Sequence, residues 1–330
     1  MKKKVTMNDI AKHLGISKNA VSQALSGKDG VSEDTRQKII EAADKLGYVY
    51  KKMKTTDSKK VVLVGAERIF SLDFFGSIYL SAQSELSSLN MELSIISISD
   101  EDVESKEIPQ GIYEADGILI LSHIEDEYIK SIVELNIPCV LIDHHIPNLN
   151  VDCVLINNRF GAYSAVNHLI ELNHNIVGFL GDIKYSPSYY ERLEGYKLAL
   201  YKNNLDICDD YIFENVANEI DLIRDIIKSL GDNVPKAWFC ANDMLGCLLL
   251  NALRELNYKV PEDISICSFD NAEFSNLMVP KITSVDIKRE YLGKKAVDVL
   301  LWRLSNLDEV HQEILINTEL VIKQSTQPLL

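Results

Sequence analysis

VTMNDIAKHLGISKNAVSQALSG, residues 5–27, predicts two short helices joined by a tight glycine turn. The second helix has two faces when about 100° of rotation is taken per residue. Its polar face carries Lys18, Asn19, Ser22 and Gln23, and its opposite side carries Ala20, Val21, Ala24 and Leu25. The apolar side can join a small core while the polar side contacts phosphates and base edges, as a helix in a DNA major groove does.

Capping and turn residues agree with this interpretation. Thr6 and Asp9 are placed for a capping box, Gly15 can take the positive φ that ends the first helix, and Ser17 can cap the second. Ser32 is expected to cap a third helix, which Gly47 closes and whose inner face carries Ile39, Ile40, Ala43 and Leu46. The alternative is a generic three-helix bundle with an incidental polar face. Because caps, turn and two-faced helix coincide, we favour a helix-turn-helix head.

Charge divides the chain into two parts. Residues 1–60 hold 14 Lys and Arg against 7 Asp and Glu, whereas residues 61–330 hold 20 against 42. A cationic head releases counterions from DNA on binding, and an anionic body avoids nonspecific binding to DNA. Solubility alone would also favour an acidic body, so it is the charge of the head that points to nucleic acid.

Neither a membrane span nor a metal site is expected. No stretch approaches about 18 apolar residues, and Asp9 and Lys12 interrupt any apolar segment after Lys2–Lys4. The six cysteines form no CxxC pair and no zinc spacing with the seven histidines. We therefore expect a cytoplasmic protein with reduced thiols, no metal and no cofactor.

After a polar linker or hinge at residues 49–60, short β-branched runs alternate with amphipathic stretches. This alternation indicates an α/β fold with doubly wound parallel sheets, and so many strands favour two lobes over one sheet. The expected strands are 61–66, 93–98, 117–121, 139–143, 153–156, 176–181, 237–240 and 264–268. The expected helices are 76–89, 126–135, 160–173, 188–203, 219–230, 243–256 and 290–305.

Polar residues follow several of these strands, where a cleft between two lobes would receive them. They are Asp143, Asn157, Asn158, Asn242, Asp243, Asp270 and Asn271, and Arg192 lies at the start of a later helix. Such groups suit a polyhydroxylated ligand, because carboxylates accept hydroxyl hydrogen bonds and Arg donates in a fixed fork. The aromatic pair Phe74 and Phe75 suits the apolar face of a sugar. A capping or loop role stays open for each residue, and Arg192 and Asp270 are the strongest candidates.

Together these segments resemble the LacI/GalR family of bacterial transcription regulators. The resemblance covers essentially the whole chain through the head, INNRFGA (156–162), ERLEGY (191–196), FCANDMLG (239–246), DISICSFDN (263–271) and LGKKAVDVLL (292–301). It implies a sequence-specific DNA-binding transcriptional repressor without enzymatic activity. Two heads of a homodimer would bind a pseudo-palindromic double-stranded operator. A small effector, a sugar or sugar derivative, would bind between the lobes and control operator binding by allostery.

The resemblance also assigns residues to three sites by matching motif positions. The residues expected at DNA are Thr6, Ser17, Lys18, Asn19, Ser22, Gln23 and Ser26, of which Lys18, Asn19 and Gln23 would contact bases. The hinge residues are Lys51, Lys52 and Met53. The effector contacts would be Phe74, Asn157, Ser188, Arg192, Asn242 and Asp270.

The chain departs from the family pattern at three places. Gln23 stands where the family usually has Arg, and Gln pairs better with adenine than with guanine. In the hinge, Asp57 stands in place of the apolar wedge, so either the hinge stays extended or Met53 substitutes for the wedge. This puts operator bending and signal transmission through the hinge in doubt. Asn157 replaces an acidic residue and so weakens one expected hydroxyl contact.

The predicted organisation is a small all-α helix-turn-helix head joined to a two-lobed, periplasmic-binding-protein-like body. The head is residues 1–48, the hinge 49–60 and the body 61–330, where the body binds effector and dimerises. Lobe one would comprise about 61–160 and 291–320, and lobe two about 161–290 and 321–330. No leucine heptad follows the strand expected at Glu319–Lys323, and we expect a dimer rather than a tetramer.

Two other classes of protein are alternatives at this stage. A two-lobed small-solute-binding protein without a gene-regulatory role would use the same fold, but it needs export and no signal peptide is visible. An enzyme would need a cofactor or nucleophile motif, and GxGxxG, P-loop and GxSxG are all missing. His144 and His145 suggest acid–base or metal chemistry, although two consecutive histidines after a strand are expected to face solvent.

Overall fold

The computed structural model describes residues 6–26, 31–46, 48, 59–67, 73–121 and 124–329, apart from a few side chains near the ends of these segments. The chain forms two compact units, residues 1–58 and residues 59–330, which we call the head and the body. Gly47 and the predicted hinge residues Lys51, Lys52 and Met53 lie outside the described residues.

The head is a three-helix unit around a small apolar core. Its helices are α1 (Met7–Leu14), α2 (Lys18–Ser26) and α3 (Glu33–Leu46). Ile10, Val21 and Ile39, one from each helix, are completely buried. They form the centre of a cluster that also contains Ala11, Ala24, Ala42 and Ala43. The short alanine side chains allow the three helices to approach one another within so small a unit.

The predicted caps and turn of the head are confirmed. The Asp9 carboxylate accepts hydrogen bonds from the N–H and the hydroxyl of Thr6 at 2.8 and 2.7 Å. Gly15 has a φ of 66°, which ends α1, and Ser17 Oγ accepts the Ala20 N–H at 3.1 Å. Helix ends and turn in this part of the chain therefore follow from local sequence alone.

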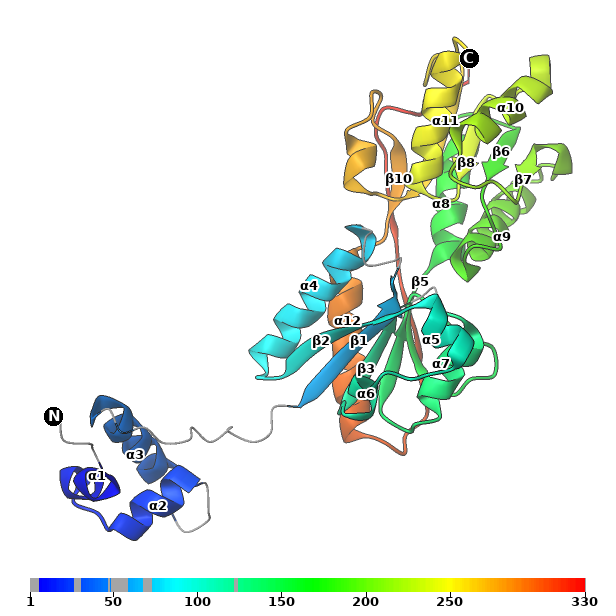
Figure 1. Ribbon diagram of the computed structural model, residues 1–330. Helices are drawn as coiled ribbons and strands as arrows, with labels where there is room; N and C mark the ends of the chain where they lie inside the picture. Colours follow the sequence, from blue (N-terminus) through cyan, green and yellow to red (C-terminus); the bar gives the residue numbers. More distant parts are fainter. Residues whose placement is uncertain are drawn as a thin grey trace. The chain divides into compact units, whose positions relative to one another are not determined.

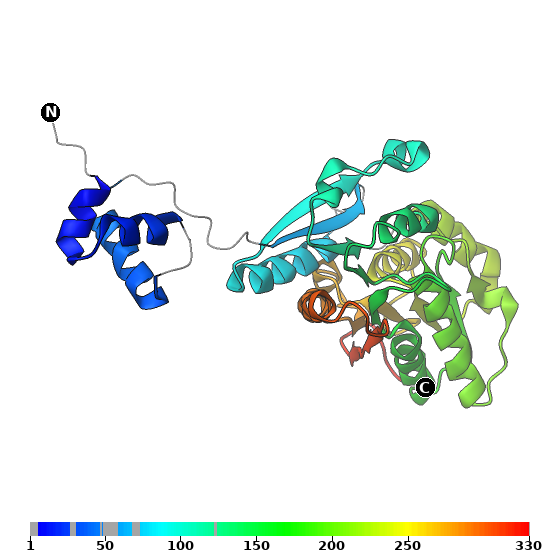
Figure 2. The same cartoon turned by 90° about the horizontal axis from the view of Figure 1, so that it is seen from below.

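Lobe one of the body is a six-stranded parallel sheet in the order β11-β5-β4-β3-β1-β2. The strands are β1 (Lys60–Ala66), β2 (Glu92–Ile98), β3 (Gly117–Leu121), β4 (Cys139–Ile142), β5 (Asp152–Ile156) and β11 (Glu313–Ile316). Val61 and Leu63 pack on one face, and Val62 and Val64 on the other, because side chains alternate along a strand. The first face is covered by α4 (Asp73–Ser88) and α12 (Arg289–Ser305), which lie side by side in Figures 1 and 2, and the second by α5 (Asp100–Ser105), α6 (Gln110–Tyr113) and α7 (Asp126–Val133).

Lobe two is a second six-stranded sheet in the order β12-β10-β9-β8-β6-β7. Its strands are β6 (Val177–Leu180), β7 (Ile212–Phe213), β8 (Ala237–Cys240), β9 (Ser265–Asp270), β10 (Thr283–Asp286) and β12 (Glu319–Val321), of which β12 runs antiparallel to β10. Its helices are α8 (Asn158–Glu171), α9 (Pro187–Lys202), α10 (Ile220–Leu230) and α11 (Asp243–Glu255), with short 3₁₀ turns at Asp209–Tyr211, Gly231–Asn233 and Glu273–Asn276. Helix α8 packs against α9, and α10 against α11.

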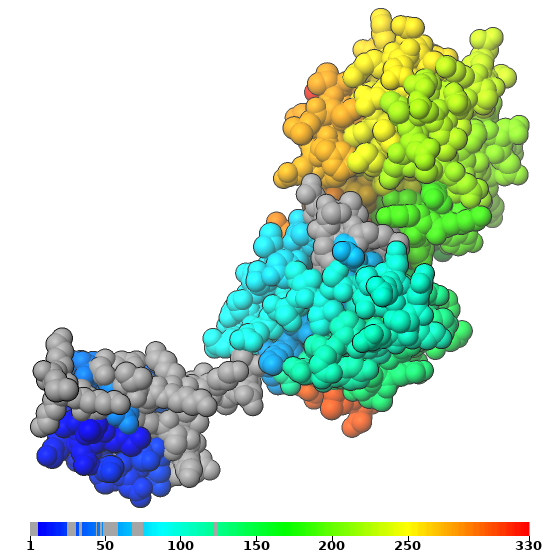
Figure 3. Space-filling view, in the orientation of Figure 1, coloured from blue at the N-terminus to red at the C-terminus, as the bar shows by residue number. Residues whose placement is uncertain are grey.

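The chain crosses between the lobes three times, after β5, after β10 and between β11 and β12. Each lobe is therefore assembled from segments that are far apart in sequence. The space-filling view shows the cyan residues of lobe one and the yellow residues of lobe two as separate masses (Figure 3). The α/β fold class predicted from the sequence is confirmed.

Every strand and helix predicted for the body before residue 310 is present, with ends that differ by at most a few residues. The strand expected at Glu319–Lys323 is Glu319–Val321. The sequence did not predict β7, β10, β11, α5 or α6. These elements have two to six residues, too few for a period of two or 3.6 to stand out.

Candidate functional site

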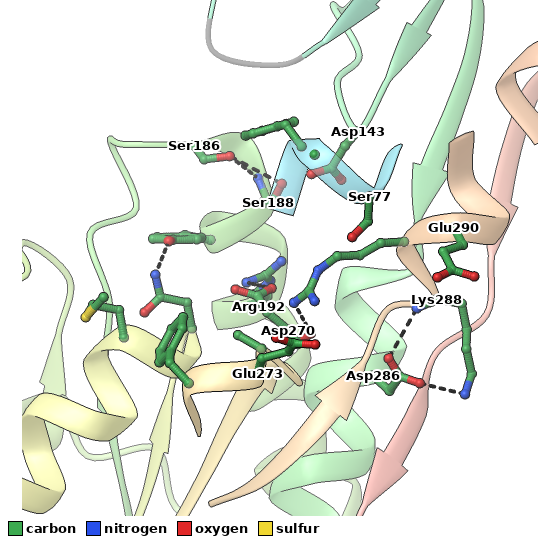
Figure 4. Close-up of a pocket in the computed structure, with 18 of the residues that line it drawn as sticks. Ser77, Asp143, Ser186, Ser188, Arg192, Asp270, Glu273, Asp286, Lys288 and Glu290 are labelled. Carbon is green, nitrogen blue, oxygen red and sulfur yellow. Dashed lines mark hydrogen bonds and ion pairs between the residues drawn. The ribbon is translucent and has the colours of Figure 1, made fainter. Parts of the chain in front are cut away.

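A cavity of about 1010 Å³ opens between the two lobes of the body. Lobe one contributes Asp143, which follows β4, and Glu290 on α12. Lobe two contributes Arg192 on α9, Asn242 before α11 and Asp270 at the end of β9. Figure 4 shows these segments converging on one space. The volume suits a small organic ligand, and its place at the carboxyl ends of parallel strands is the usual one for α/β sheets.

Arg192 is the central cation of this cleft, and only 2% of it is exposed. Its Nε donates to Asn158 Oδ1 at 2.9 Å, and its Nη1 donates to the Ala241 carbonyl at 2.6 Å. Nη1 also lies 3.1 Å from Asp270 Oδ1, and the guanidinium carbon lies 3.8 Å from the centre of the Phe269 ring. Nη2 makes no hydrogen bond to any part of the chain that the structure describes. Its two N–H groups therefore remain for a ligand.

The first turns of α9 hold Arg192 in place. Ser186 caps the helix by accepting the Ser188 N–H at 3.3 Å, and Pro187 occupies the first helical position. A Cβ added to Gly195 would lie 2.1 Å from the Arg159 carbonyl oxygen, so only glycine permits this close crossing of α8 and α9. The glycine of ERLEGY therefore brings α9, and Arg192 with it, against the start of α8.

Asp270 ends β9 in a conformation that is rare for a residue with a side chain. Its φ is 101°, and Asn271 follows with a φ of 48°. The turn is held by Lys323 Nζ, which donates to Asn271 Oδ1 at 2.7 Å, and by Arg289 Nη2, which donates to the Asp270 carbonyl. Backbone strain of this kind persists where the surroundings fix it, and here it leaves the Asp270 carboxyl in the cleft.

Asn242 has two partners that fix its orientation. Its Oδ1 caps α11 by accepting the Leu245 N–H at 2.8 Å, and its Nδ2 donates to the Tyr189 hydroxyl at 2.5 Å. The neighbouring Asp243 is buried beneath the cleft, where its carboxylate accepts the Ala272 N–H at 2.6 Å. Asn242 thus lines the cleft, while Asp243 holds the turn after β9.

Asp143 is a carboxyl of lobe one that lines the cleft. Burial raises its pKa to about 7, the positive charge of Arg192 opposes this shift, and the charges of Asp270 and Glu191 add to it. A carboxyl with such a pKa is present in both protonation states near neutral pH. It can therefore donate or accept a hydrogen bond to a ligand hydroxyl.

Of the other three predicted effector residues, only Ser188 is seen to line the cleft among the described side chains. Ser188 lines the cleft and is 7% exposed. Asn157 does not line it: its Oδ1 caps α8 by accepting the Phe160 N–H at 3.3 Å, and its Nδ2 donates to Asn317 at 3.4 Å. The side chain of Phe74 lies outside the described residues, and the cavity is lined by Phe75. Of the six residues, four reach the cleft, namely Ser188, Arg192, Asn242 and Asp270.

The expectation that both consecutive histidines face solvent is wrong for His144. This side chain is buried, and its Nε2 lies 3.0 Å from Asp126 Oδ1. Burial lowers the pKa of His144, and the hydrogen bond to Asp126 opposes that shift. His145 is half-buried between Glu191 and Glu313. The loop after β4 therefore turns one ring into lobe one and the other towards lobe two.

Tyr189 and Arg289 line the cavity and are among the cleft residues that were not predicted. Tyr189 adjoins Ser188 at the start of α9, so the predicted site could have been extended to it. Arg289 begins α12 just after β10. Because β10 was not predicted, no sequence signal placed Arg289 at the end of a strand.

The predicted DNA-contacting residues lie on α2 or just before it, except Thr6, which lies at the start of α1. Lys18 and Asn19 are exposed, and Ser22 and Gln23 are half-buried. Thr6 and Ser17 are exposed and also form the caps described above. Ser26 lies in α2, but its side chain is outside the described residues. The described part of α2 thus presents a short polar strip that begins at its N-terminus.

The described residues contain neither a metal-binding cluster nor a membrane-spanning helix. Among them no group of three or more His, Cys, Asp or Glu side chains is arranged to hold a metal ion. None of the described helices is both long enough and apolar enough to cross a bilayer.

Two family profiles match the chain. Residues 6–50 match bacterial regulatory proteins of the lacI family, and residues 166–326 match the periplasmic binding protein-like domain. The HTH-type transcriptional repressor PurR of Mannheimia succiniciproducens is 25% identical over 98% of this chain and 99% of its own length.

Solved structures share the fold of the whole chain. A complex of the transcriptional regulator CelR with cellobiose has a TM-score of 0.73 at 24% identity and covers 98% of this chain and 100% of its own. The lac repressor dimer bound to operator and the anti-inducer ONPF has a TM-score of 0.77 at 22% identity, with the same coverage of 98% and 100%. At these identities the likeness is one of fold.

Proposed function

Because the chain belongs to the LacI family of bacterial regulatory proteins, we propose that it is a transcriptional repressor whose operator affinity is set by a small effector in the cleft. It is a DNA-binding regulator and not an enzyme. The head would bind the operator, and the body would bind the effector and a second copy of the chain.

One observation supports the effector site above all others: the Arg192–Asp270 pair is incompletely satisfied. Asp270 Oδ1 lies 3.1 Å from Arg192 Nη1 but accepts no hydrogen bond of good geometry from a described residue. Arg192 Nη2 likewise retains its donors. An adjacent donor and acceptor fixed in a cavity match the neighbouring hydroxyls of a sugar. The bound cellobiose of the CelR complex agrees with a carbohydrate effector.

Regulation would follow from the two-lobed construction. A ligand that contacts Asp143 of lobe one and Arg192 of lobe two favours the lobe arrangement in which both contacts form. The same equilibrium would determine whether two heads in a homodimer match their half-sites. A differential affinity of about 2 kcal/mol gives roughly 30-fold regulation, which is within the usual range for allosteric coupling.

For DNA recognition we propose that α2 lies in the major groove of a pseudo-palindromic operator. Lys18, Asn19 and Gln23 would contact bases, and Thr6, Ser17, Ser22 and Ser26 would contact phosphates or groove edges. Gln23 favours adenine, because its amide pairs with two atoms of the adenine edge. Such a repressor would work in the cytoplasm, where its operator is.

Gel-shift assays against the region upstream of the chain's own gene test the DNA function. We expect a saturable, sequence-selective complex at about 150 mM salt, since specific binding survives the loss of nonspecific phosphate attraction. Lys18→Ala should relax base preference by about 1–3 kcal/mol. Asp206→Ala, on the surface of the body, is the control. Uniform weakening by Lys18→Ala on all DNA would assign that side chain to phosphate.

Thermal-shift measurements with ribose, glucose, cellobiose and glucose 6-phosphate test the effector site. A ligand that binds the native state raises the melting temperature, whereas one that does not bind leaves it unchanged. Binding of a sugar without any selective DNA complex would favour the alternative, a solute-binding protein. A selective DNA complex that no sugar affects would remove the carbohydrate from the proposal.

A further inference from the structure

His145 belongs to lobe one but contacts lobe two. It follows β4, and its Nδ1 lies 3.2 Å from Oε1 of Glu313 at the start of β11. Its Nε2 lies 3.5 Å from Oε1 of Glu191 on α9. The imidazole is thus placed between two carboxylates, one from each lobe.

Glu191 connects this contact to the effector-binding arginine. Its second carboxylate oxygen, Oε2, accepts a hydrogen bond from Asn158 Nδ2 at 2.9 Å. Asn158 Oδ1 accepts the Arg192 Nε–H, also at 2.9 Å. Asn158 and Arg192 are 4% and 2% exposed. An unbroken series of side-chain contacts therefore leads from His145 to the Arg192–Asp270 pair.

The links in this series differ in strength. The Asn158 contacts are short, buried and fixed by two partners on one amide, so they hold Glu191 and Arg192 as a rigid unit of lobe two. The His145–Glu191 contact is longer, and the two side chains are 38% and 28% exposed. It also joins different lobes. A change in lobe angle would therefore break this link and leave the Asn158 links in place.

We propose that His145 and Glu191 form an interlobe clasp, which positions Arg192 for the effector and couples effector binding to the angle between the lobes. This inference rests on the effector role proposed for the cleft. His145 and Glu191 act through Arg192 and are positioning residues. His145 lies in the loop after β4, and Glu191 lies in the first turns of α9.

Distance measurements between the lobes test the clasp without any ligand. Spin labels at the exposed positions Glu104 in lobe one and Asp232 in lobe two, in a Cys208→Ser background, report lobe separation by electron resonance. We expect a broader distance distribution in His145→Gln and in Glu191→Gln than in the parent protein, because each variant removes one side of the interlobe contact. His145→Lys should give a distribution as narrow as the parent's, because an ammonium group can still contact Glu191.

The matched control is Glu255→Gln, which removes a partner of Arg224 at 2.8 Å within lobe two. It should behave as the parent protein, because this pair does not cross between the lobes. A distance distribution in His145→Gln that equals the parent's would overturn the clasp.

Titration calorimetry tests the coupling to the effector site. The probe is whichever of ribose, glucose, cellobiose and glucose 6-phosphate gives the largest thermal shift in the parent protein. Glu191→Gln and His145→Gln should weaken its binding by about two- to fivefold, the range expected for a partly exposed pair. His145→Lys should retain parental affinity, and Glu255→Gln should change nothing.

The outcomes separate the clasp from the proposed function. If Glu191→Gln binds the probe as tightly as the parent protein, the positioning role is wrong. If no sugar binds the parent protein, the proposed carbohydrate effector fails, and the distances between labels still decide whether the clasp holds the lobes. A loss of affinity in Glu255→Gln equal to that in Glu191→Gln would show a general effect of charge and would also overturn the proposal.

Discussion

Two buried Arg–Asp pairs lie in the body, and they are built differently. In lobe one, Arg303 on α12 donates to both oxygens of Asp152, from Nε at 2.6 Å and from Nη2 at 3.1 Å. Its remaining N–H groups donate to the carbonyls of Asn306, Glu309 and Val310 at 2.9, 2.7 and 3.1 Å. Asp152 is completely buried and also accepts the Gln312 N–H. Every donor of this guanidinium is used inside the protein.

In the cleft, Arg192 uses only some of its hydrogen-bond donors. Nε and Nη1 are bonded within lobe two, Nη2 has no hydrogen bond among the described residues, and Asp270 is 20% exposed. Both arginines lie against aromatic rings, and both are about equally buried. Burial of the arginine therefore does not distinguish the structural pair from the pair proposed to bind effector. The unused donors and acceptors distinguish them, because a buried polar group without a partner is retained only where something else can satisfy it.

Breaking the Arg303–Asp152 pair, whose donors are all used inside the protein, should have the largest effect on stability. Asp152→Ala is expected to lower the free energy of unfolding by about 3–5 kcal/mol, because it leaves the buried Arg303 charge without its carboxylate. Burial alone would raise the pKa of Asp152, but the hydrogen bonds from Arg303 and Gln312 outweigh it and lower that pKa. Urea unfolding measures the loss. Effector affinity of the protein that remains folded should be unchanged, and a loss below about 1 kcal/mol would contradict the distinction drawn here.

Breaking the Arg192–Asp270 pair should have the opposite pattern, with a large loss of effector affinity and a small loss of stability. Asp270→Asn keeps the shape of the side chain but removes its charge, and we expect effector affinity to fall about 10- to 100-fold. Stability should change by only about 1 kcal/mol, because Asp270 is partly exposed and Arg192 keeps two other partners. Calorimetry and urea unfolding on the same samples provide the two values. A large loss of stability without loss of affinity would make this pair structural as well.

The same contrast explains how much of the site could be predicted from sequence. Arg192, Asn242 and Asp270 lie at ends of elements whose periodicity is clear, so the topology of parallel strands places them at one edge. The caps of the head needed only neighbours three residues apart. Asp152 and Arg303 are 151 residues apart and come together only because β5 and α12 pack in lobe one. No local sequence pattern therefore predicts the pair.

The sequence analysis misplaced Asn157 and His144, two polar side chains that could each find a hydrogen-bond partner in more than one place. Asn157 follows a strand, which suggested the cleft, but it also precedes α8, and capping that helix satisfies its amide. His144 is buried because Asp126, at the start of α7, offers its ring a partner 18 residues earlier in the chain. The positions of Asn157 and His144 depend on hydrogen-bond partners that the fold supplies. Residue type and spacing in the sequence do not reveal these partners.

Asp143 offers the smallest and sharpest test of the comparison, because it is a cleft carboxyl that forms no ion pair with another described residue. In the unfolded chain its pKa is about 3.9, whereas burial raises it to about 7 in the folded protein. Between these pH values the unfolded chain loses a proton that the folded protein keeps, so folded stability falls as pH rises. Asp143→Asn stays neutral, and its melting temperature relative to the parent should increase by several °C between acidic and alkaline pH. Fluorimetry at about pH 4.5 and 8 measures this, with exposed Asp206→Asn as control. A pH-independent difference would mean that solvent or a cation reaches Asp143 in the cleft.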